Sequence, residues 1–466
     1  MGKQTIFGLI LGSMVLVVLT GCKSFNGDKV RREHAESYPA ALAQTTDQAL
    51  ATETSLGLED CLRIALEHSL EARSAEIQER VAKLERKIAF ANFLPSVSLD
   101  YTHYEFDPEI NLELNGDTMT IDKIRSFSWQ ANASIFNPAT WFLYSLHKRG
   151  EEIAELVTDY TRQMTVLQVT MLYFQCLSLE EMDRGLAGEL AAAEELEKEL
   201  ATLADEGLIS AWQAEEAQVL VQARRLQRQQ TARNLEQGKA ALLAAMGLSP
   251  LADVSLKVQT PLERPAGTLD DLVLEALLCH PQLRIADRSI EIEKEQVRMA
   301  VSNFLPKLFG FVTYPDSLDD FVKASDQWLY GLSGTMTLFN GFANINEYKA
   351  ARARRKKSFI AREQASLAVM LEVVSAHLTV QTAEEQVALA QRVSDVAAKR
   401  LTETENQWRE GLVNASALLE ATARRDKARA QAISARFQHQ VTTATLLNVM
   451  GKTNIDYEEP EHDSAS

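Results

Sequence analysis

The chain has 466 residues, a formal net charge of −17, and a composition that is 46% hydrophobic but only 7% aromatic. So acidic a chain is a poor partner for nucleic acid, and its modest content of 20 glycines and 11 prolines favours long helices. There is no HExxH sequence, the histidines lack ligand spacing, and Gly451-Lys452-Thr453 lacks the upstream glycine of a phosphate loop. We therefore expect no enzyme, no metal site and no cofactor.

The N-terminus has the features of an export signal. Lys3 precedes an apolar run over residues 6–19, which is shorter than the roughly 20 residues of a membrane-spanning helix. The run ends at Leu19-Thr20-Gly21-Cys22, which resembles a bacterial lipobox and implies removal of residues 1–21 and lipidation of Cys22. Lys23, where an aspartate would favour inner-membrane retention, implies delivery to the outer membrane. The alternative is an ordinary signal peptide with an incidental cysteine.

The segment that follows, residues 22–57, is polar and weakly patterned. We predict a lipid-anchored tether or wrapping segment here. Beyond it lie Cys61, Cys176 and Cys279, an odd number without a CxxC pair. This count favours buried free thiols over a disulfide framework.

Most of the chain is a duplication. Three short sequences recur in the same order at offsets of 211, 204 and 204 residues, namely Asn92-Phe93-Leu94-Pro95 as Asn303-Phe304-Leu305-Pro306, Gly207-Leu208 as Gly411-Leu412, and Met246-Gly247 as Met450-Gly451. We therefore predict a first structural repeat over residues 58–266, a second over 267–456, and an acidic tail over 457–466.

Each repeat is predicted to begin with one helix, over residues 58–92 and 269–303, followed by a β-hairpin at about 96–136 and about 307–338. Alternation within the hairpins predicts strands of about 9 to 11 residues, with loops near 107–121 and 315–326, which suits membrane strands. Four aromatic side chains fall on one face of the predicted strands, and we predict that they contact lipid: Phe127, Trp129, Trp328 and Tyr330. The alternative is that this face forms the core of a soluble sheet.

Four such strands cannot close a barrel. An open sheet edge in lipid leaves backbone groups unpaired at a cost of several kcal/mol each, so other copies of the chain must complete the sheet. Three copies would supply twelve strands, although the strand count alone does not choose the number.

The repeats continue as very long helices, predicted from Trp141 to about Glu206 and from Phe342 to about Glu410. At about 1.5 Å per residue each could reach about 100 Å. Each long helix ends at a Gly-Leu pair and returns as an alanine-rich helix. Gly207 and Gly411 suit these reversals because glycine tolerates positive φ.

This duplicated order of helix, hairpin, long helix and return, with Leu338-Phe339-Asn340-Gly341 before the second long helix, resembles TolC-type outer membrane efflux proteins. The resemblance implies a mostly α fold with a membrane β-barrel portion. Three protomers would form a 12-stranded outer-membrane barrel continued by a periplasmic α-barrel. It also implies an exit duct that works with a periplasmic adaptor, or membrane fusion protein, and an inner-membrane transporter.

The resemblance further assigns candidate residues at the helix tips. Ser416-Ala417-Leu418-Leu419-Glu420-Ala421 matches a family gate pattern with only one of its two acids. Glu420 is therefore a candidate for a periplasmic gate, together with Trp408 at a latch position and Glu216 at the equivalent place in the first repeat. Both glutamates have the alternative of being ordinary solvated carboxylates. Adaptor docking is expected at the tip turns, Gly207, Leu208, Gly411 and Leu412.

The favoured function is the outer-membrane exit duct of a tripartite efflux pump, which conducts substrate passively. One alternative is the outer-membrane channel of a type I protein secretion system. The other is a non-channel periplasmic coiled-coil lipoprotein scaffold, held through Cys22, which would leave the two amphipathic hairpins unexplained.

Overall fold

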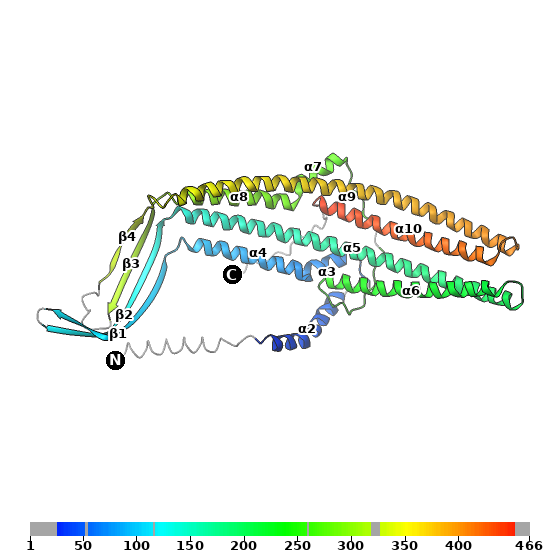
Figure 1. Ribbon diagram of the computed structural model, residues 1–466, viewed down its shortest axis with the longest axis horizontal. Helices are drawn as coiled ribbons and strands as arrows, with labels where there is room; N and C mark the ends of the chain where they lie inside the picture. The colour runs from blue at the N-terminus through cyan, green and yellow to red at the C-terminus, as the bar shows by residue number, and fades with distance from the viewer. Residues whose placement is uncertain (1–25, 52–54, 115–116, 259–260, 318–326, 453–466) are drawn as a thin grey trace.

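The computed structural model describes residues 26–51, 55–114, 117–258, 261–317 and 327–452. The predicted signal peptide, the lipidation site Cys22 and the acidic tail over 457–466 lie outside these ranges. The molecule is elongated, with a sheet at one end and two helical hairpin tips at the other (Figure 1).

The sheet is antiparallel, with its four strands in chain order. They are β1 Ser96–Leu114, β2 Asp117–Phe136, β3 Lys307–Ser317 and β4 Leu329–Thr335. β2 pairs with β3, so strands from the two repeats join in the middle of the sheet. For the first hairpin the predicted strand length of about 9 to 11 residues and the predicted loop at 107–121 are wrong, because β1 and β2 are 19 and 20 residues long and continue into that region. Of the second predicted loop, 315–326, the first three residues belong to β3 and residues 318–326 lie outside the described ranges.

A helix pair precedes each hairpin where the sequence predicted one helix. The pairs are α3 Leu58–His68 with α4 Leu70–Ala91, and α7 Leu269–Cys279 with α8 Pro281–Ser302. Between them Ser69 and His280 take ψ values of 128° and 126°, outside the helical range.

Both breaks have a local cause. The Ser69 side chain accepts a hydrogen bond from the Ala72 N–H at 3.4 Å, and the His280 ring accepts one from the Gln282 N–H at 3.2 Å. His280 also precedes Pro281, whose ring disfavours a helical conformation in the residue before it. The single-helix prediction is therefore wrong in both repeats.

The N-terminal segment also contains a helix, α2 Gly27–Leu50, which the weak sequence pattern did not predict. Asn26 caps it by accepting a hydrogen bond from the Lys29 N–H at 3.1 Å. Most of α2 is exposed, but Thr46 is buried and accepts a hydrogen bond from the Ser249 N–H at 2.8 Å. The C-terminal part of α2 thus packs on the middle of the molecule.

The long helices are α5 Pro138–Asp205 and α9 Ala343–Arg409, with the return helices α6 Ala211–Ala245 and α10 Ala415–Val449. Below the sheet the helices pack side by side in the order α4, α5, α8, α9 (Figure 1). Toward the tips the order becomes α6, α5, α10, α9. The predicted fold class, a duplicated and mostly helical chain with a β portion, is confirmed.

The joint between β4 and α9 differs from the joint between β2 and α5. Gly341 and Phe342 have φ of 65° and 64°. A phenylalanine in this left-handed region costs roughly 1–2 kcal/mol. Asn137-Pro138 makes the first joint in an ordinary conformation.

The largest core lies at mid-length, between α3, α5 and α6. Its centre is the fully buried Tyr173, whose hydroxyl donates a hydrogen bond to the Lys257 carbonyl at 2.6 Å and lies 3.3 Å from the Leu56 carbonyl oxygen. All three described cysteines are free. Burial raises the pKa of both the Cys61 and Cys176 thiols to about 12, which makes them unreactive. Cys279 is exposed, contrary to the prediction of burial.

Candidate functional site

The pairing register places the four predicted lipid-facing aromatics on one face of the sheet. Trp129 pairs with Leu99 on one side and with Tyr314 on the other. The Tyr314 ring lies 4.9 Å from that of Trp328, and the Phe127 ring 6.2 Å from that of Trp129. Tyr330 joins the same face through its pairing with Val312, two residues from Tyr314.

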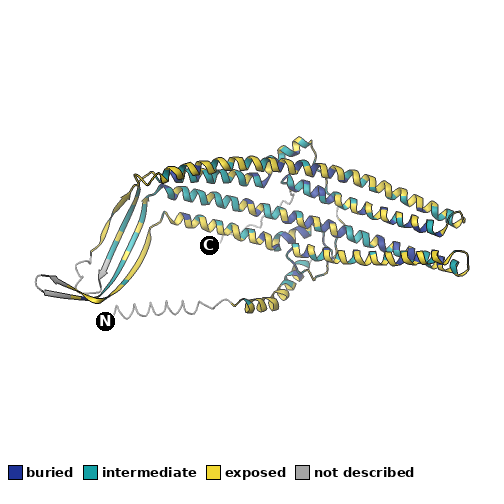
Figure 2. Ribbon diagram, viewed as in Figure 1, coloured by how far each residue is buried: buried dark blue, intermediate teal, exposed yellow. Residues whose placement is uncertain are grey.

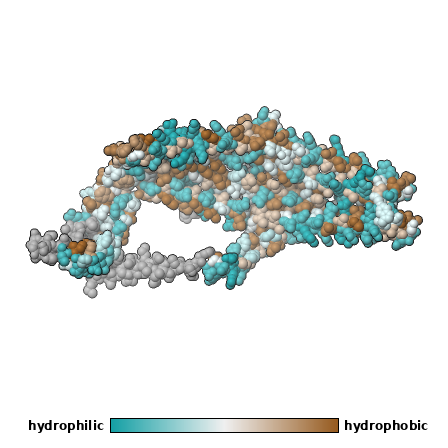
Figure 3. Space-filling view, viewed as in Figure 1, coloured by the Kyte–Doolittle hydropathy of each residue, from teal (hydrophilic) through white to brown (hydrophobic). Residues whose placement is uncertain are grey.

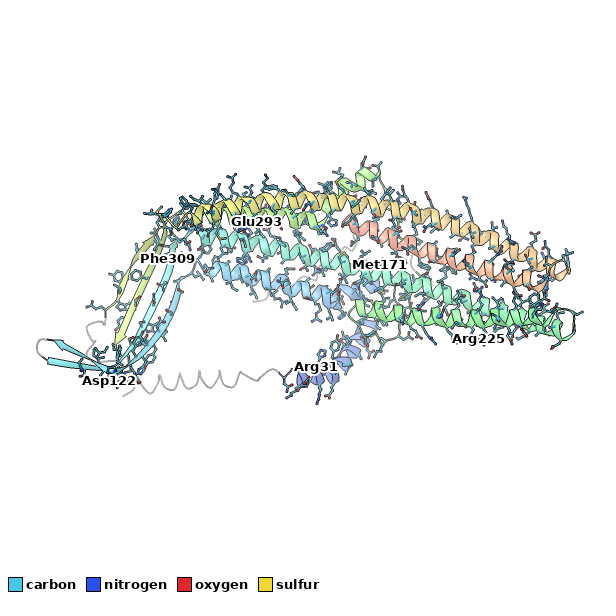
Figure 4. All side chains as sticks on the ribbon, in the orientation of Figure 1. Arg31, Asp122, Met171, Arg225, Glu293 and Phe309 are labelled. Atoms are coloured by element: carbon cyan, nitrogen blue, oxygen red, sulfur yellow. The ribbon has the colours of Figure 1, made fainter. Side chains whose placement is uncertain are left out.

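The other face of the sheet is largely polar. Ser98, Gln130 and Thr313 form one row across β1, β2 and β3, and Asp100 pairs with Ser128 in the next row. Figure 4 shows the side chains of this region, including Phe309 on β3. The exceptions on this face are Phe309 and Phe311 of β3, which pair with Ser134 and Asn132. A sheet with clustered aromatic side chains on one face and mainly polar side chains on the other suits a wall between lipid and water.

Both lateral edges of the helical wall carry apolar stripes that no described residue covers. Five exposed side chains on α4 are spaced by 7, 4, 3 and 4 residues: Leu70, Ile77, Val81, Leu84 and Ile88. Four on α9 are spaced by 7, 4 and 7: Ile360, Leu367, Leu371 and Leu378. Exposed residues run along the length of α9, and apolar residues lie among polar ones on the wall (Figures 2 and 3).

These spacings are those of a coiled-coil seam, in which apolar residues of two helices interdigitate. One 18-residue window of α9 reaches a mean hydropathy of 1.2, yet only 28% of it is buried within the protomer. Because this helix continues for 67 residues and lies among other helices, we attribute its apolar exposure to helix packing.

The tip turns are built identically in the two repeats. Gly207 and Gly411 have φ of 73° and 72°. The following N–H groups, of Leu208 and Leu412, each donate at 2.8 Å to the carbonyls of Leu203 and Gln407. This is the pattern of a helix C-terminus closed by a left-handed residue. The side chains of Leu208 and Leu412 are 67% and 70% exposed at the end of the molecule.

Trp408 and Glu216 lie where the two tip hairpins meet. Trp408 is partly buried and packs against residues of α5, α6 and α10, namely Leu200, Ala217, Leu419 and Ala421. Glu216 on α6 accepts a hydrogen bond from the Ser416 hydroxyl on α10 at 2.7 Å. These two predicted residues therefore connect the first hairpin to the second.

Glu420 is placed differently from Glu216. Its side chain is 63% exposed and forms an ion pair with Arg424, one turn further along α10. The partner partly compensates the charge that a carboxylate at this position would present.

A buried charged cluster also connects the two helical tip hairpins, and the sequence analysis did not predict it. Asp426 on α10 is 1% exposed and forms ion pairs with Arg224 of α6 at 2.9 Å and with Arg425 at 2.8 Å. Glu189 on α5 is buried nearby, and the Arg429 guanidinium lies 3.6 Å from the place where a Cβ on Gly185 would be. Figure 4 shows this tip half, with Arg225 labelled on α6.

Burial controls the protonation of both acids. It raises the pKa of Asp426 in spite of the neighbouring arginines, which act in the opposite direction. Burial followed by repulsion from Asp426 raises the pKa of Glu189. One signal could have found Asp426: it lies 7 residues after Leu419 and 4 after Thr422, on the buried seam of α10.

Comparison with known proteins shows which family shares this sequence and which solved structures share this fold. The sequence profile of the family described as outer membrane efflux protein matches residues 61–248 and 272–452. No curated protein matches the sequence. The CmeC outer membrane channel of Campylobacter jejuni is 16% identical with a TM-score of 0.75, over 85% of this chain and 87% of that chain.

Two further solved structures have the same fold. CusC is 17% identical with a TM-score of 0.74, over 84% of this chain and 92% of that chain. Its crystal structures concern the conformational changes that accompany folding and formation of a transmembrane channel. The open state of the MtrE outer membrane channel of Neisseria gonorrhoeae is 18% identical with a TM-score of 0.70. The match covers 84% of this chain and 88% of that chain.

The family match covers most of the chain in two blocks, one in each repeat, so this chain belongs to the outer membrane efflux protein family. The predicted resemblance and the outer-membrane location are thereby confirmed. The family is one of channels rather than enzymes, and it gives no support to the alternative of a non-channel scaffold.

Proposed function

We propose that three copies of this chain form the exit duct of a tripartite efflux pump. In this duct an inner-membrane transporter and a periplasmic adaptor deliver substrate, which then passes through the outer membrane. The transporter supplies the energy, and the chain described here conducts passively. Secretion of proteins through a type I system is the second use of such a duct, and no feature of the described residues favours it.

The observation that supports the proposal most directly is that each protomer has two lateral edges whose outermost strands and helices have a neighbour on only one side among the described elements. β1 and β4 are the outer strands of the four-stranded sheet, and α4 and α9 end the helical wall below it. If β4 pairs with β1 of the next copy, the stripe of α9 meets that of α4. Three copies then give twelve strands, enough to close a barrel around a water-filled lumen.

The helix tips suit the two remaining parts of the proposal. Leu208 and Leu412 present exposed apolar side chains at the periplasmic end, where an adaptor would dock. Trp408 and the hydrogen bond between Glu216 and Ser416 would hold the hairpins together in the closed duct. Exposed Glu420 side chains from three copies would form an acidic ring that favours cations.

Lipidation of Cys22 completes the proposal. The anchor would hold the N-terminal segment at the membrane, while α2 packs on the middle of the tube through Thr46. Barrel insertion does not require the anchor, so Cys22→Ala protein should remain integral to the membrane. Release of this variant into the soluble fraction would contradict the barrel.

The first experiment measures the mass of the mature protein in detergent together with its single-channel conductance in a planar bilayer. We expect a trimer with discrete, cation-preferring openings. A monomer that never conducts would overturn the duct. A conducting trimer that fails to restore small-molecule efflux with any adaptor and transporter pair, yet restores export of a protein, would assign it to secretion.

A further inference from the structure

The first turns of α9 carry a dense positive charge next to the sheet. Over residues 349–357 there are six basic side chains, and no acidic residue occurs from 348 to 362. They are Lys349, Arg352, Arg354, Arg355, Lys356 and Lys357, which we call the α9 basic segment. All except Arg355 are exposed.

Within the protomer, no residue that the structure describes neutralises this charge. Among the described residues, none of the six forms an ion pair, and the nearest cation contacts are with rings. The Arg352 guanidinium lies 5.7 Å from the Tyr348 ring centroid and that of Arg355 lies 5.7 Å from Phe359. Farther along, Arg362 does pair with Asp287 of α8, at 2.9 Å.

The first repeat lacks this feature. The equivalent stretch of α5, residues 145–153 at the 204-residue offset, has two basic and two acidic residues. Arg149 pairs there with Glu152 at 2.7 Å and with Glu291 at 2.8 Å. Long helices of this fold therefore do not need a basic start, so the charge on α9 requires a separate explanation.

A neighbouring copy would not neutralise the segment. In the proposed closed wall α9 lies against α4 of the next protomer. Counted from the helix ends that adjoin the sheet, the stretch of α4 at the same depth is residues 77–85, which has two basic and two acidic residues. One of the acids, Glu85, already lies 3.9 Å from His147 of its own protomer. This helix therefore brings no net negative charge that could neutralise the segment.

In the proposed duct the segment would lie at the height of a membrane surface. Leu338, Phe339 and Phe342 are exposed apolar residues between β4 and α9, which is where aromatic residues mark a membrane boundary. The basic side chains begin six residues into the helix, about 9 Å below its start. Long basic side chains extend toward head groups, and the field of a charged leaflet reaches about a Debye length of 8–10 Å.

We propose that the α9 basic segment binds anionic phospholipid head groups of the membrane leaflet nearest the helices. With three copies it forms a positive girdle beneath the barrel, which fixes the depth of the duct in the membrane. Juxtamembrane clusters of lysine and arginine are attracted to anionic lipid in this way.

The test uses the purified, assembled protein in detergent, with phosphatidylglycerol or phosphatidylcholine added and the retained lipid counted by native mass spectrometry. The test variant replaces five residues by glutamine: Lys349, Arg352, Arg354, Lys356 and Lys357. Arg355 is kept because it is partly buried. The matched control removes five exposed positive charges from the tip half: Arg392, Lys399, Arg400, Arg409 and Lys427.

Wild-type protein and the control should retain phosphatidylglycerol at least about tenfold over phosphatidylcholine, with the preference falling as salt is raised. The test variant should lose the preference while keeping its oligomeric mass. Equal retention of both lipids by wild-type protein would overturn the proposal. So would an unchanged lipid preference in the test variant accompanied by a shift of channel reversal potential, because the charge would then act in the lumen.

Discussion

The two repeats share their landmarks but occupy different environments. α5 has helices on both sides, and near its start Arg149 pairs with Glu152 and with Glu291 of α8. α9 ends the wall, and it carries an apolar stripe and a basic segment that are neither covered nor ion-paired by any residue in the described ranges. The comparison shows that the two repeats keep the same scaffold, whereas their exposed surfaces differ with their position in the wall.

The largest effect should come from the exposed stripe of α9. Leu371 is 69% exposed, whereas its counterpart Leu167 in the first repeat lies half-buried inside the wall. Leu371→Glu would place charges in each proposed seam, and we expect the trimer to be lost while the helical content remains. Native mass measurement and circular dichroism check this. The control is Leu251→Glu, at a 92% exposed loop position, and a Leu371→Glu trimer as stable as wild type would remove α9 from the interface.

The second prediction compares equivalent glycines after the return helices. Gly247 and Gly451 both have positive φ, 75° and 72°. A Cβ at Gly247 would lie 2.1 Å from the His68 carbonyl oxygen, but at Gly451 only 3.5 Å from that of Cys279. Gly451→Ala should cost roughly 1–2 kcal/mol of backbone strain.

Gly247→Ala should lower the unfolding temperature substantially more than Gly451→Ala, since the backbone of the α3–α4 break must also move. Thermal unfolding followed by circular dichroism measures both. Equal losses would mean that the close approach of Gly247 to His68 does not contribute to packing.

A smaller effect is expected at the proposed gate. Glu420→Ala should reduce the cation permeability ratio by a factor of roughly two, because Arg424 would then be left without its partner and would repel cations. The control is Glu216→Ala in the first repeat, which removes the hydrogen bond from Ser416 and should affect closure more than selectivity. Reversal potentials in a salt gradient distinguish the two, and an unchanged potential would exclude Glu420 from the constriction.

The smallest effect concerns pH. The folded-state pKa values of Asp426 and Glu189 are raised, so the folded protein binds these protons more tightly than the unfolded chain. Their contribution to stability is complete below the ordinary carboxyl values of 3.8 and 4.5 and is lost as pH rises through the raised values.

Asp426→Asn should therefore flatten the decrease in unfolding temperature as the pH rises above the ordinary carboxyl value of 3.8. The first repeat has the neutral Gln222 at the equivalent position, so a neutral side chain is compatible with the scaffold. A slope identical to that of the wild type would show that Asp426 stays ionised throughout this range.

Sequence periodicity predicted the duplication, the two hairpins and the long helices, because each is a repeated local signal. It did not predict the helix breaks at Ser69 and His280, although Pro281 was a usable signal for the second. The ends of β1 and β2 were missed because their pairing continues through a sequence rich in polar residues.

The site was predicted less completely than the fold. The aromatic face of the sheet follows from alternation alone, and the register agrees with it. The cluster around Asp426 was missed although its spacing from Leu419 and Thr422 places Asp426 on the buried seam of α10, because charges on an acidic helical chain usually face solvent. Only the packing of α5, α6 and α10 shows that this carboxylate is enclosed by arginines.

The presence of two different lateral edges on each protomer has a genetic consequence. In the proposed trimer each copy would meet its neighbours through different surfaces, α4 with β1 on one side and α9 with β4 on the other. A copy with a mutation at its tips but with both edges intact would still assemble, and it would inactivate the trimer that contains it. With equal expression of intact and damaged copies, only roughly one eighth of three-membered rings would be wholly intact. Tip mutations should therefore be dominant over the wild-type allele, whereas edge mutations should be recessive.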